Sequence, residues 1–260
     1  KSSTAKIVFA GIVRDAAEHL ETVTIPLLER TASKLTNDYV ILVYENDSMD
    51  GTDRVLRAFE NRNSKVRILS SMSPSSSLPS PTSHFGIWDK KRFDAMAKAR
   101  DVYLRETRET YSDYDYLVVV DMHATLSWNI ETFLESIRPE RCTTCSWDVL
   151  CANGMYSENK KYYDGLAYRP FGFQETLSEW LKMMHAVLSS TFDFRDPMFQ
   201  VQSCFGGMAI YKIETLLRAS ECSYFDDSSE DCEHVRLHKC LHERVKAKVF
   251  LNTALELYRR

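Results

Sequence analysis

Long apolar runs are missing from the sequence. None approaches the ~20 consecutive residues that a helix needs to cross a bilayer, so we expect no transmembrane segment within these 260 residues. No signal peptide opens the sequence either. The first residue, Lys1, is not an initiator methionine, so a preceding anchor or stem stays compatible with it.

An excess of positive charge is also missing. The 33 Lys and Arg residues face 37 Asp and Glu residues, which gives a formal net charge of -4. A chain without a global basic field is not built to hold DNA or RNA, so we expect no nucleic-acid partner. Internal repeats and breaks in composition are absent too, and the length suits one large α/β domain, so we expect a single domain over residues 1–260.

Cysteine is present in an odd number, seven, so at least one cysteine has no partner within the chain. Six of the seven fall into two groups, Cys142, Cys145 and Cys151 in the first and Cys222, Cys232 and Cys240 in the second. Disulfides formed in a secretory lumen and reduced thiols in a cytosol fit this pattern equally well.

Apolar strand patterns alternate with helical patterns along the chain. Strands are expected at 5–13, 39–44, 66–69, 116–120, 147–152, 208–211 and 247–251, and helices at 16–35, 53–61, 93–110, 173–188 and 232–244. Because the strands are apolar throughout, we predict an α/β fold with a mostly parallel sheet covered by helices on both faces. The Ser/Pro-rich segment 70–83 is predicted to be a loop, either a surface excursion or a flap over a ligand.

Polar residues follow three of the predicted strands. Arg14 comes after the first strand, Glu45 and Asp47 come after the second, and Asp121 and His123 follow the strand at 116–120. In an open α/β sheet, ligands bind at the carboxyl ends of the strands. We therefore predict that these side chains share one pocket at that edge.

Five segments, taken in order, resemble those of glycosyltransferases with the GT-A fold, a Rossmann-like α/β fold. They are VYENDSMDGT at 43–52, Ala-Arg-Asp at 99–101, VVVDMHA at 118–124, CFGGMAIY at 204–211 and DCEHVRL at 231–237. The ENDS-DGT, WD-x-x-CANG, YYD and CEH patterns are closer to fungal capsule-type mannosyltransferases and to glycosyltransferases of large algal viruses.

That resemblance implies transfer of a sugar from a nucleotide-sugar donor to a glycan hydroxyl. It places the nucleotide-binding part at about 1–125 and the part for the sugar and acceptor at about 126–260. The donor would be a GDP- or UDP-sugar, and a mannosyl donor is implied only by the capsule-type patterns.

The family pattern also implies roles in holding the nucleotide. Glu45 matches the acid that accepts hydrogen bonds from the base, although a turn-ordering role fits Glu45 and Asp47 as well. Arg100 matches the arginine beside the diphosphate, whose fork of donors suits phosphate oxygens. Arg92 and Arg14 are further candidates for that task, and a solvated surface arginine is the alternative in each case.

Asp121 and His123 stand where the family carries Asp-x-Asp, the pair that binds ribose and a divalent metal. Such a metal neutralises charge on the leaving diphosphate. Because His123 replaces the last acid, we expect manganese to be preferred over magnesium, with His234 as a further ligand. The alternative is that metal use has been lost and arginines carry the charge.

Glu233 and Asp231 are the candidates for the base that deprotonates the acceptor hydroxyl in an inverting enzyme. A retaining enzyme would need no such base. The alternative is that both acids serve the helix start, with Asp231 as its cap and Glu233 near its positive end.

Residues that could contact the donor sugar or the acceptor lie between the VVVDMHA and CFGGMAIY segments and within the second of these segments. Aromatic faces stack on sugars, carboxylates and amides bind hydroxyl groups, and glycines allow a close backbone approach. The candidates are Trp147, Asp148, Asn153, Asp164, Gly206 and Gly207. Core packing and turn formation are the alternative roles for the same residues.

Two other functions compete with sugar transfer. The loss of the last acid at His123 is compatible with a degenerate domain that binds a nucleotide or a glycan without turnover. Histidines at 234, 238 and 242 share one helix face near Cys232 and Cys240, which is compatible with a zinc-stabilised interaction protein. We expect the lumen of the ER or Golgi if an anchor precedes the chain and the cytoplasm otherwise. The sequence does not specify an oligomeric state.

Overall fold

The computed structural model describes residues 5–35, 38–70, 90–138, 147–173, 176–189 and 198–260. Cys142, Cys145 and nearly all of the Ser/Pro-rich segment lie outside these ranges. The strands are β1 (Ile7–Val13), β2 (Tyr39–Glu45), β3 (Val66–Ser70), β4 (Tyr116–Val120), β5 (Thr125–Trp128), β6 (Val149–Tyr156), β7 (Arg169–Pro170), β8 (Met198–Ser203), β9 (Met208–Lys212) and β10 (Val249–Arg259). The helices are α1 (Ala17–His19), the π-helix η1 (Leu20–Thr24), α2 (Ile25–Ala32), α3 (Thr52–Arg62), α4 (Lys90–Thr110), α5 (Ile130–Ser136), α6 (Leu177–Ser189), α7 (Ile213–Arg218) and α8 (Glu233–Val245).

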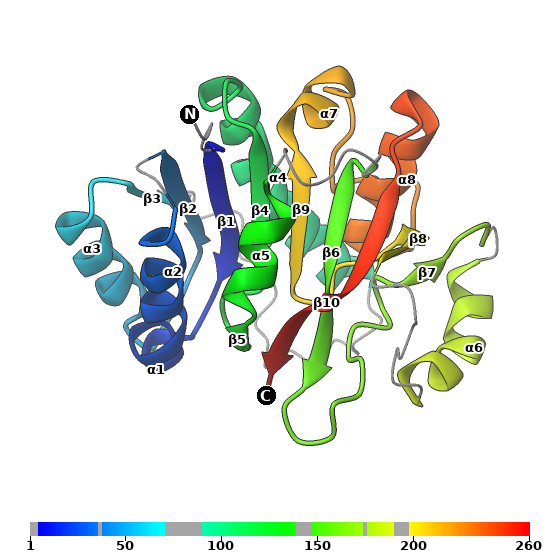
Figure 1. The fold of residues 1–260 in the computed structure, drawn as a ribbon, viewed down its shortest axis with the longest axis horizontal. Coiled ribbons are helices and arrows are strands. Elements are labelled where there is room, and N and C mark those ends of the chain that lie inside the picture. Colours follow the sequence, from blue (N-terminus) through cyan, green and yellow to red (C-terminus); the bar gives the residue numbers. More distant parts are fainter. Residues whose placement is uncertain (1–4, 36–37, 71–89, 139–146, 174–175, 190–197) are drawn as a thin grey trace.

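All ten strands form one sheet, in the order β3-β2-β1-β4-β9-β6-β10-β8-β7, with β5 paired to β10. The strands β3, β2, β1 and β4 are parallel, and β6 is parallel to β10. The strand β9 lies antiparallel between β4 and β6, so β4 and β6 point in the same direction. The sheet is therefore mixed, and its two parallel groups end at the same edge (Figure 1).

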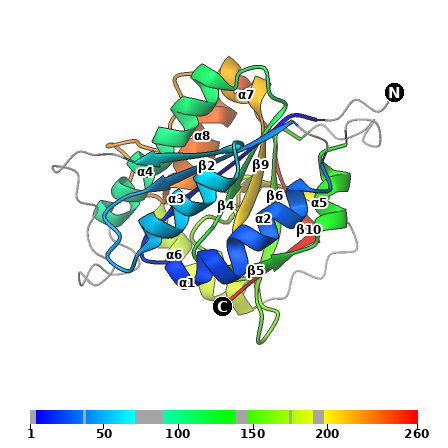
Figure 2. The same ribbon diagram turned by 90° about the vertical axis from the view of Figure 1, so that its left-hand side faces the viewer.

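Helices cover both faces of the sheet because the side chains of the buried strands alternate between two apolar clusters. In β1, Val8 and Ala10 belong to one cluster, whereas Ile7 and Phe9 belong to the other. The first cluster packs against residues of α4, α6, α7 and α8, and the second against residues of α2, α3 and α5. Figure 2 shows the sheet edge-on between these two layers. The predicted α/β fold with helices on both faces is thus confirmed.

Most predicted elements are present, with changes at their ends. The expected helix at 16–35 is one helical stretch from α1 through η1 to α2, and the strand expected at 247–251 continues to Arg259 as β10. The short elements β5, α5, β7, β8 and α7 were not predicted, because runs of two to seven residues leave little periodicity to detect. None of the described helices is long and apolar enough to span a membrane.

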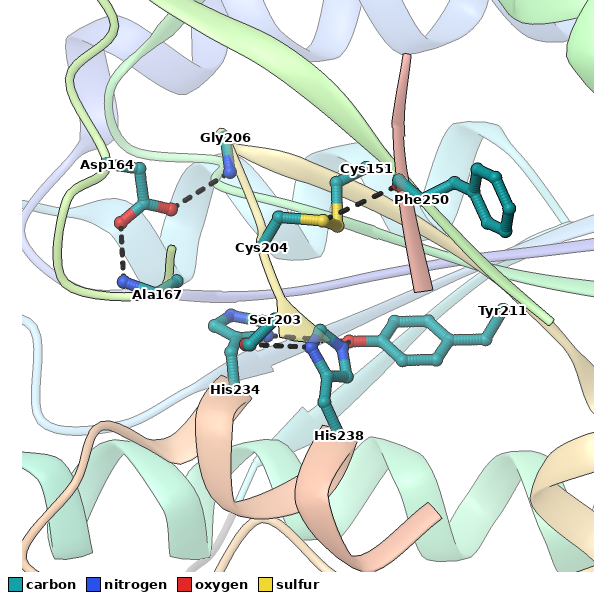
Figure 3. The surroundings of a disulfide bond; sticks show 10 residues. All are labelled: Cys151, Asp164, Ala167, Ser203, Cys204, Gly206, Tyr211, His234, His238 and Phe250. Carbon is teal, nitrogen blue, oxygen red and sulfur yellow. Dashed lines mark hydrogen bonds between the residues drawn. A yellow bond between two sulfur atoms is a disulfide. The ribbon is translucent and has the colours of Figure 1, made fainter. Parts of the chain in front are cut away.

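Two disulfides join cysteines that are distant in sequence. Cys151 in β6 is bonded to Cys204, and Cys222 is bonded to Cys240 in α8. Cys232, the free cysteine among the described residues, is buried. The first bond anchors the segment that leads into Gly206, which matters for the site below (Figure 3).

Candidate functional site

The carboxyl ends of β2, β1 and β4 lie next to one another, as the sheet order requires. In the parallel register, Val13 of β1 pairs with Glu45 of β2. The loops that follow these strands are joined, because the Asp15 N–H donates to Ser48 Oγ over 3.1 Å and the Met49 N–H donates to Asp15 Oδ1 over 2.7 Å. The structure therefore brings the polar segments after the three strands to one edge of the sheet.

Glu45 is buried, with 8% of its surface exposed, and its Oε1 accepts a hydrogen bond of 2.9 Å from the Ser48 N–H. It therefore orders the turn after β2, which is the alternative role expected for it. Asp47 is exposed and has a left-handed φ of 57°. Asp50 secures the same loop, since its carboxylate accepts hydrogen bonds from the Thr52 hydroxyl and N–H and from the Ala17 N–H.

Asp121 follows β4 and is the centre of a small charged group. Its backbone N–H donates to the Gly207 carbonyl oxygen over 2.8 Å. Its Oδ1 lies 2.7 Å from His123 Nδ1, and its Oδ2 lies 3.9 Å from Arg259 Nη1. Burial alone would raise the pKa of Asp121, but His123 and Arg259 outweigh it and lower this pKa to about 2. In turn, Asp121 raises the pKa of His123, so the two form an ion pair when His123 is protonated.

The three-residue metal set expected from the sequence is not assembled. Nowhere in the described ranges do three His, Cys, Asp or Glu side chains gather in a way that could hold an ion. His234 is only 2% exposed, and its ring stacks on Phe205 with 3.9 Å between ring centroids. Asp121 and His123 do lie together, and a carboxylate with an imidazole is a donor pair that Mn²⁺ accepts. The residues thus fit a metal as a partial set of two ligands.

Arg100 and Glu233, predicted for different roles, are paired with each other. The Arg100 Nε–H donates to Glu233 Oε1 over 3.0 Å, and the two side chains are 4% and 5% exposed. The Arg100 Nη1 also donates to the Tyr103 hydroxyl over 3.2 Å, and the guanidinium lies 5.2 Å from the Phe205 ring centroid. Burial would lower the pKa of Arg100, but Tyr103 and Glu233 raise it well above its usual value. This arginine is therefore a buried cation with anionic and polar partners of its own.

Asp231, the other candidate base, is also paired with a buried arginine. Its Oδ1 contacts Nη2 of Arg169, whose side chain is 2% exposed. The same oxygen accepts a 3.2 Å hydrogen bond from the Cys232 N–H, just before α8 begins. Both candidate bases thus lie at the start of α8, each neutralised by an arginine from another part of the chain.

The Gly206–Gly207 turn contacts the strand β6 and Asp121 through its backbone. Both glycines have left-handed φ values, 60° and 80°. A Cβ added to Gly206 would lie 2.0 Å from the Ala152 carbonyl oxygen, so only glycine fits there. Because Gly207 also accepts the Asp121 N–H, this turn sets the position of the charged group.

Asp164 holds the same turn from the other side. Its Oδ2 accepts a 2.9 Å hydrogen bond from the Gly206 N–H, and its Oδ1 accepts one of 3.3 Å from the Ala167 N–H (Figure 3). Burial raises the pKa of Asp164 to about 6, and the nearby carboxylates of Glu233 and Asp121 add to this effect. Asp164 is therefore a half-buried acid that lies close to Glu233 and Asp121.

A chain of buried polar side chains runs behind the site. The Ser203 hydroxyl lies 2.9 Å from His238 Nδ1, and His238 Nε2 lies 2.9 Å from the Tyr211 hydroxyl. That hydroxyl is 3.4 Å from Nδ1 of His234 (Figure 3). Burial lowers the pKa of His238 to about 3, which keeps its ring neutral. The zinc site considered above does not form, because Cys240 is bonded to Cys222, His234 and His238 belong to this network, and His242 Nδ1 lies 3.2 Å from the Ala247 carbonyl oxygen.

Trp147 and Asp148 lie at the opposite edge of the sheet, contrary to the prediction that they contact a sugar. They precede β6, whose carboxyl end points toward Asp121. The Trp147 ring packs 5.8 Å from Tyr116 at the start of β4, and Asp148 accepts hydrogen bonds from the Thr215 hydroxyl and the Lys248 N–H. Trp147 therefore packs in the apolar core, and Asp148 accepts hydrogen bonds at the edge of that core.

Asn153 lies in β6 beyond the midpoint, on the side of the site. Its side chain is buried, and its amide donates weakly to the Thr253 carbonyl oxygen over 3.4 Å. Its Oδ1 is buried and finds no hydrogen-bond partner in the described part of the chain. An acceptor of this kind can receive a hydroxyl donor.

Arg14 and Arg92 lie toward the same edge of the sheet. The Arg14 Nε lies 3.6 Å from Oδ2 of Asp15 and its side chain is 19% exposed. Arg92 is exposed in the first turn of α4. Since α4 leads into β4 and runs antiparallel to it, this first turn lies toward the carboxyl edge.

Arg259 belongs to the site, but sequence reasoning missed it, whereas its neighbour Tyr163 is part of the YYD pattern noted in the sequence. The Arg259 guanidinium lies 4.4 Å from the centroid of the Tyr163 ring and 3.9 Å from Asp121. The signal that could have found Arg259 is the alternation of Leu255 and Leu257, both fully buried, with more exposed residues to the end of β10. That alternation predicts that the strand continues to Arg259, so this residue is expected at the carboxyl edge.

A model of the family described as cryptococcal mannosyltransferase 1 matches residues 6–242, which is most of the chain and includes every candidate residue except Arg259. The chain belongs to this family. No curated protein sequence matches the chain significantly.

Solved structures show the same fold at low sequence identity. Residues 1–349 of TarS from S. aureus give a TM-score of 0.57 at 11% identity, covering 97% of this chain and 60% of that one. The mannosyltransferase PcManGT from Pyrobaculum calidifontis, solved with GDP-Man and Mn²⁺, gives 0.55 at 13%, covering 99% and 57%. GalNAc-T7, solved with UDP, GalNAc and Mn²⁺, gives 0.59 at 8%, covering 100% and 44%. The fold of this family member is thus GT-A, and the chain spans less than two thirds of each matched structure.

Proposed function

We propose that this protein is a glycosyltransferase that moves a sugar from a nucleotide-sugar donor to a hydroxyl group of a glycan. The observation that carries the proposal is the charged group at the carboxyl edge of the sheet, where Asp121, His123 and the Gly207 backbone meet. Family membership over residues 6–242 supports the same conclusion. The mannosyl identity of the sugar is the finer part of the proposal and rests on the family alone.

The nucleotide would lie along the ends of β1 and β2. Glu45 and Asp47 are proposed to face the base and ribose, with Arg14 and Arg92 supplying positive charge at the same edge. The binding role of Glu45 is compatible with its turn-ordering hydrogen bond, because a carboxylate accepts several hydrogen bonds at once. The base is either guanine or uracil, as in the donors named for the matched structures.

Asp121 and His123 would hold a divalent metal, with manganese preferred because an imidazole suits it better than magnesium. When bound, such an ion neutralises the negative charge that develops on the leaving diphosphate. His123 would have to lose its proton, and therefore its ion pair with Asp121, before its Nδ1 could coordinate.

The sugar and acceptor would lie beside Gly206, Gly207, Asn153 and Asp164. The two glycines let the backbone approach the donor closely. Glu233, or Asp231 next to it, is proposed to accept the proton of the acceptor hydroxyl. The arginine partners of both acids hold these carboxylates in place.

The test is turnover across a panel of UDP- and GDP-sugars with glycan acceptors, with and without Mn²⁺, followed by release of the nucleoside diphosphate. The expected result is release with one base only, stimulated by Mn²⁺ and lost in Asp121→Asn. No release with any donor, while donor binding stays intact, would refute the enzyme proposal.

A second function is favoured by one specific observation. Both candidate bases are paired with buried arginines, and the metal set has only two of its three expected members. A degenerate domain that binds a nucleotide-sugar or a glycan without turnover would have these features. Binding without release in the assay above would select it.

A further inference from the structure

Arg259 lies beside Asp121, at the edge of the sheet where the proposed function puts the donor. The residue comes from β10, and its Nη1 lies 3.9 Å from Oδ2 of Asp121. The strand β10 reaches that point because it pairs with β6 through its last residues, where Arg259 is opposite Tyr156. The cation is therefore placed by the sheet itself.

Tyr163 holds the guanidinium in a defined position. Its ring centroid lies 4.4 Å from Arg259 Cζ, a cation–π contact that orients the plane of the guanidinium. The same Tyr163 also borders Gly207, because a Cβ added there would lie 2.6 Å from the Tyr163 hydroxyl. One continuous group of contacting residues is thus formed by Arg259, Tyr163, Gly207 and Asp121.

Exposure separates Arg259 from the arginine that the family pattern assigns to the diphosphate. The Arg259 side chain is 27% exposed, whereas that of Arg100 is 4% exposed and bonded to Glu233 and Tyr103. A guanidinium that is already paired and buried would have to give up those partners to reach a phosphate. The Arg259 Nη1 could exchange a long contact of 3.9 Å with Asp121 for a ligand oxygen, while the Nε–H keeps its hydrogen bond of 3.3 Å to the Arg260 carbonyl oxygen.

We infer that Arg259 is a phosphate-binding residue that contacts the diphosphate of the donor, the task that the family pattern assigns to Arg100. The inference rests on the proposed function. It predicts that the Arg259 contribution belongs to the phosphates and not to the nucleoside, and that it is largest when no metal is present.

The experiment is calorimetric titration of the full chain with UDP and GDP, and with uridine and guanosine, each with and without Mn²⁺. For whichever base binds, Arg259→Gln should weaken the metal-free diphosphate complex by about 10-fold or more and leave nucleoside binding within about 2-fold. Arg259→Lys should recover part of the loss. Arg244→Gln removes a surface arginine of α8, which pairs with Glu221, and should change neither affinity.

A double variant separates direct contact from an effect through Asp121. If Arg259 only neutralises that carboxylate, Arg259→Gln should have no effect in an Asp121→Asn background, and this result would overturn the inference. A persistent 10-fold loss would support contact with the ligand. Unchanged diphosphate binding in Arg259→Gln overturns this inference alone, whereas a wild-type chain that binds neither nucleoside diphosphate overturns the proposed function and the inference together.

Discussion

The buried pair of Arg100 and Glu233 allows a quantitative test of how this site is held together. We predict that Arg100→Met destabilises the protein strongly, because it leaves the Glu233 carboxylate in a position where only 5% of the side chain is exposed. The Tyr103 hydroxyl would also lose the donor that contacts it over 3.2 Å. The pair joins α4 to the start of α8, so its loss affects two helices on the same face of the sheet.

Removal of one partner from a buried ion pair costs about 3–5 kcal/mol, since an uncompensated charge stays in a medium of low polarity. For a chain of this size, each kcal/mol shifts the midpoint of thermal unfolding by about 2–4 °C, so the expected shift is about 6–20 °C. Arg100→Met with Glu233→Leu removes both charges, and an apolar replacement of a buried pair is close to neutral. The double variant should therefore recover most of the stability.

Urea unfolding followed by circular dichroism, with the disulfides intact, measures the free energy of unfolding of the wild type, the two single variants and the double variant. The expected coupling between the two substitutions is several kcal/mol and has the sign of mutual stabilisation. If Arg100→Met lost less than about 1 kcal/mol, or the double variant were no better than the single one, the pair would not be a buried structural contact. Arg100 would then be available for a ligand, as the family pattern implies.

Three further predictions concern other parts of the molecule. Gly206→Ala would place a Cβ 2.0 Å from a backbone oxygen of β6 and should cost at least about 3 kcal/mol or abolish folding. Gly172→Ala, also at positive φ but in open space, should cost about 1 kcal/mol in the same denaturation assay. His238 has a pKa of about 3 in the folded protein, below its unfolded value of about 6.5, so the unfolded chain takes up the proton first and stability falls as pH drops below about 6.5. His238→Gln should make this fall shallower by up to about 1.4 kcal/mol per pH unit, and equal slopes for both proteins would contradict the reasoning. Replacement of Cys151 and Cys204 by serines opens a loop of 53 residues and should cost about 4 kcal/mol in urea unfolding of the otherwise oxidised protein, and a loss below about 1 kcal/mol would contradict this reasoning.

The edge of the sheet that carries the candidate site could be predicted from two features of the sequence, the apolar runs and the polar residues that follow them. The runs at β2 and β4 are continuous and apolar, and each is followed by an acid or acids at the carboxyl edge, so Glu45 and Asp121 were placed near each other from sequence. The same rule also excludes Trp147 and Asp148, because these residues precede their strand and therefore start at the other edge. Applied consistently, it would have removed them from the sugar site.

The partners of charged side chains could not be predicted in this way. Arg100 and Glu233 are 133 residues apart, and each was assigned a ligand because its actual partner lay far along the chain. Arg259 was missed because Asn252 and Thr253 interrupt the apolar pattern where β10 changes its register against β6. Pairings of this kind depend on how α8 and β10 pack against the rest of the fold. No periodic pattern in the sequence indicates that packing.

The strand β10 comes after all the other described strands in the sequence, and the site depends on it. Arg259 contacts a carboxylate 138 positions earlier in the chain, and Glu233 pairs with a helix residue almost as distant. Arg100 and Asp121 therefore leave the ribosome well before Glu233 and Arg259, the residues that they contact in the folded protein. The burial of the Arg100 charge against Glu233 thus depends on a helix that is synthesised much later.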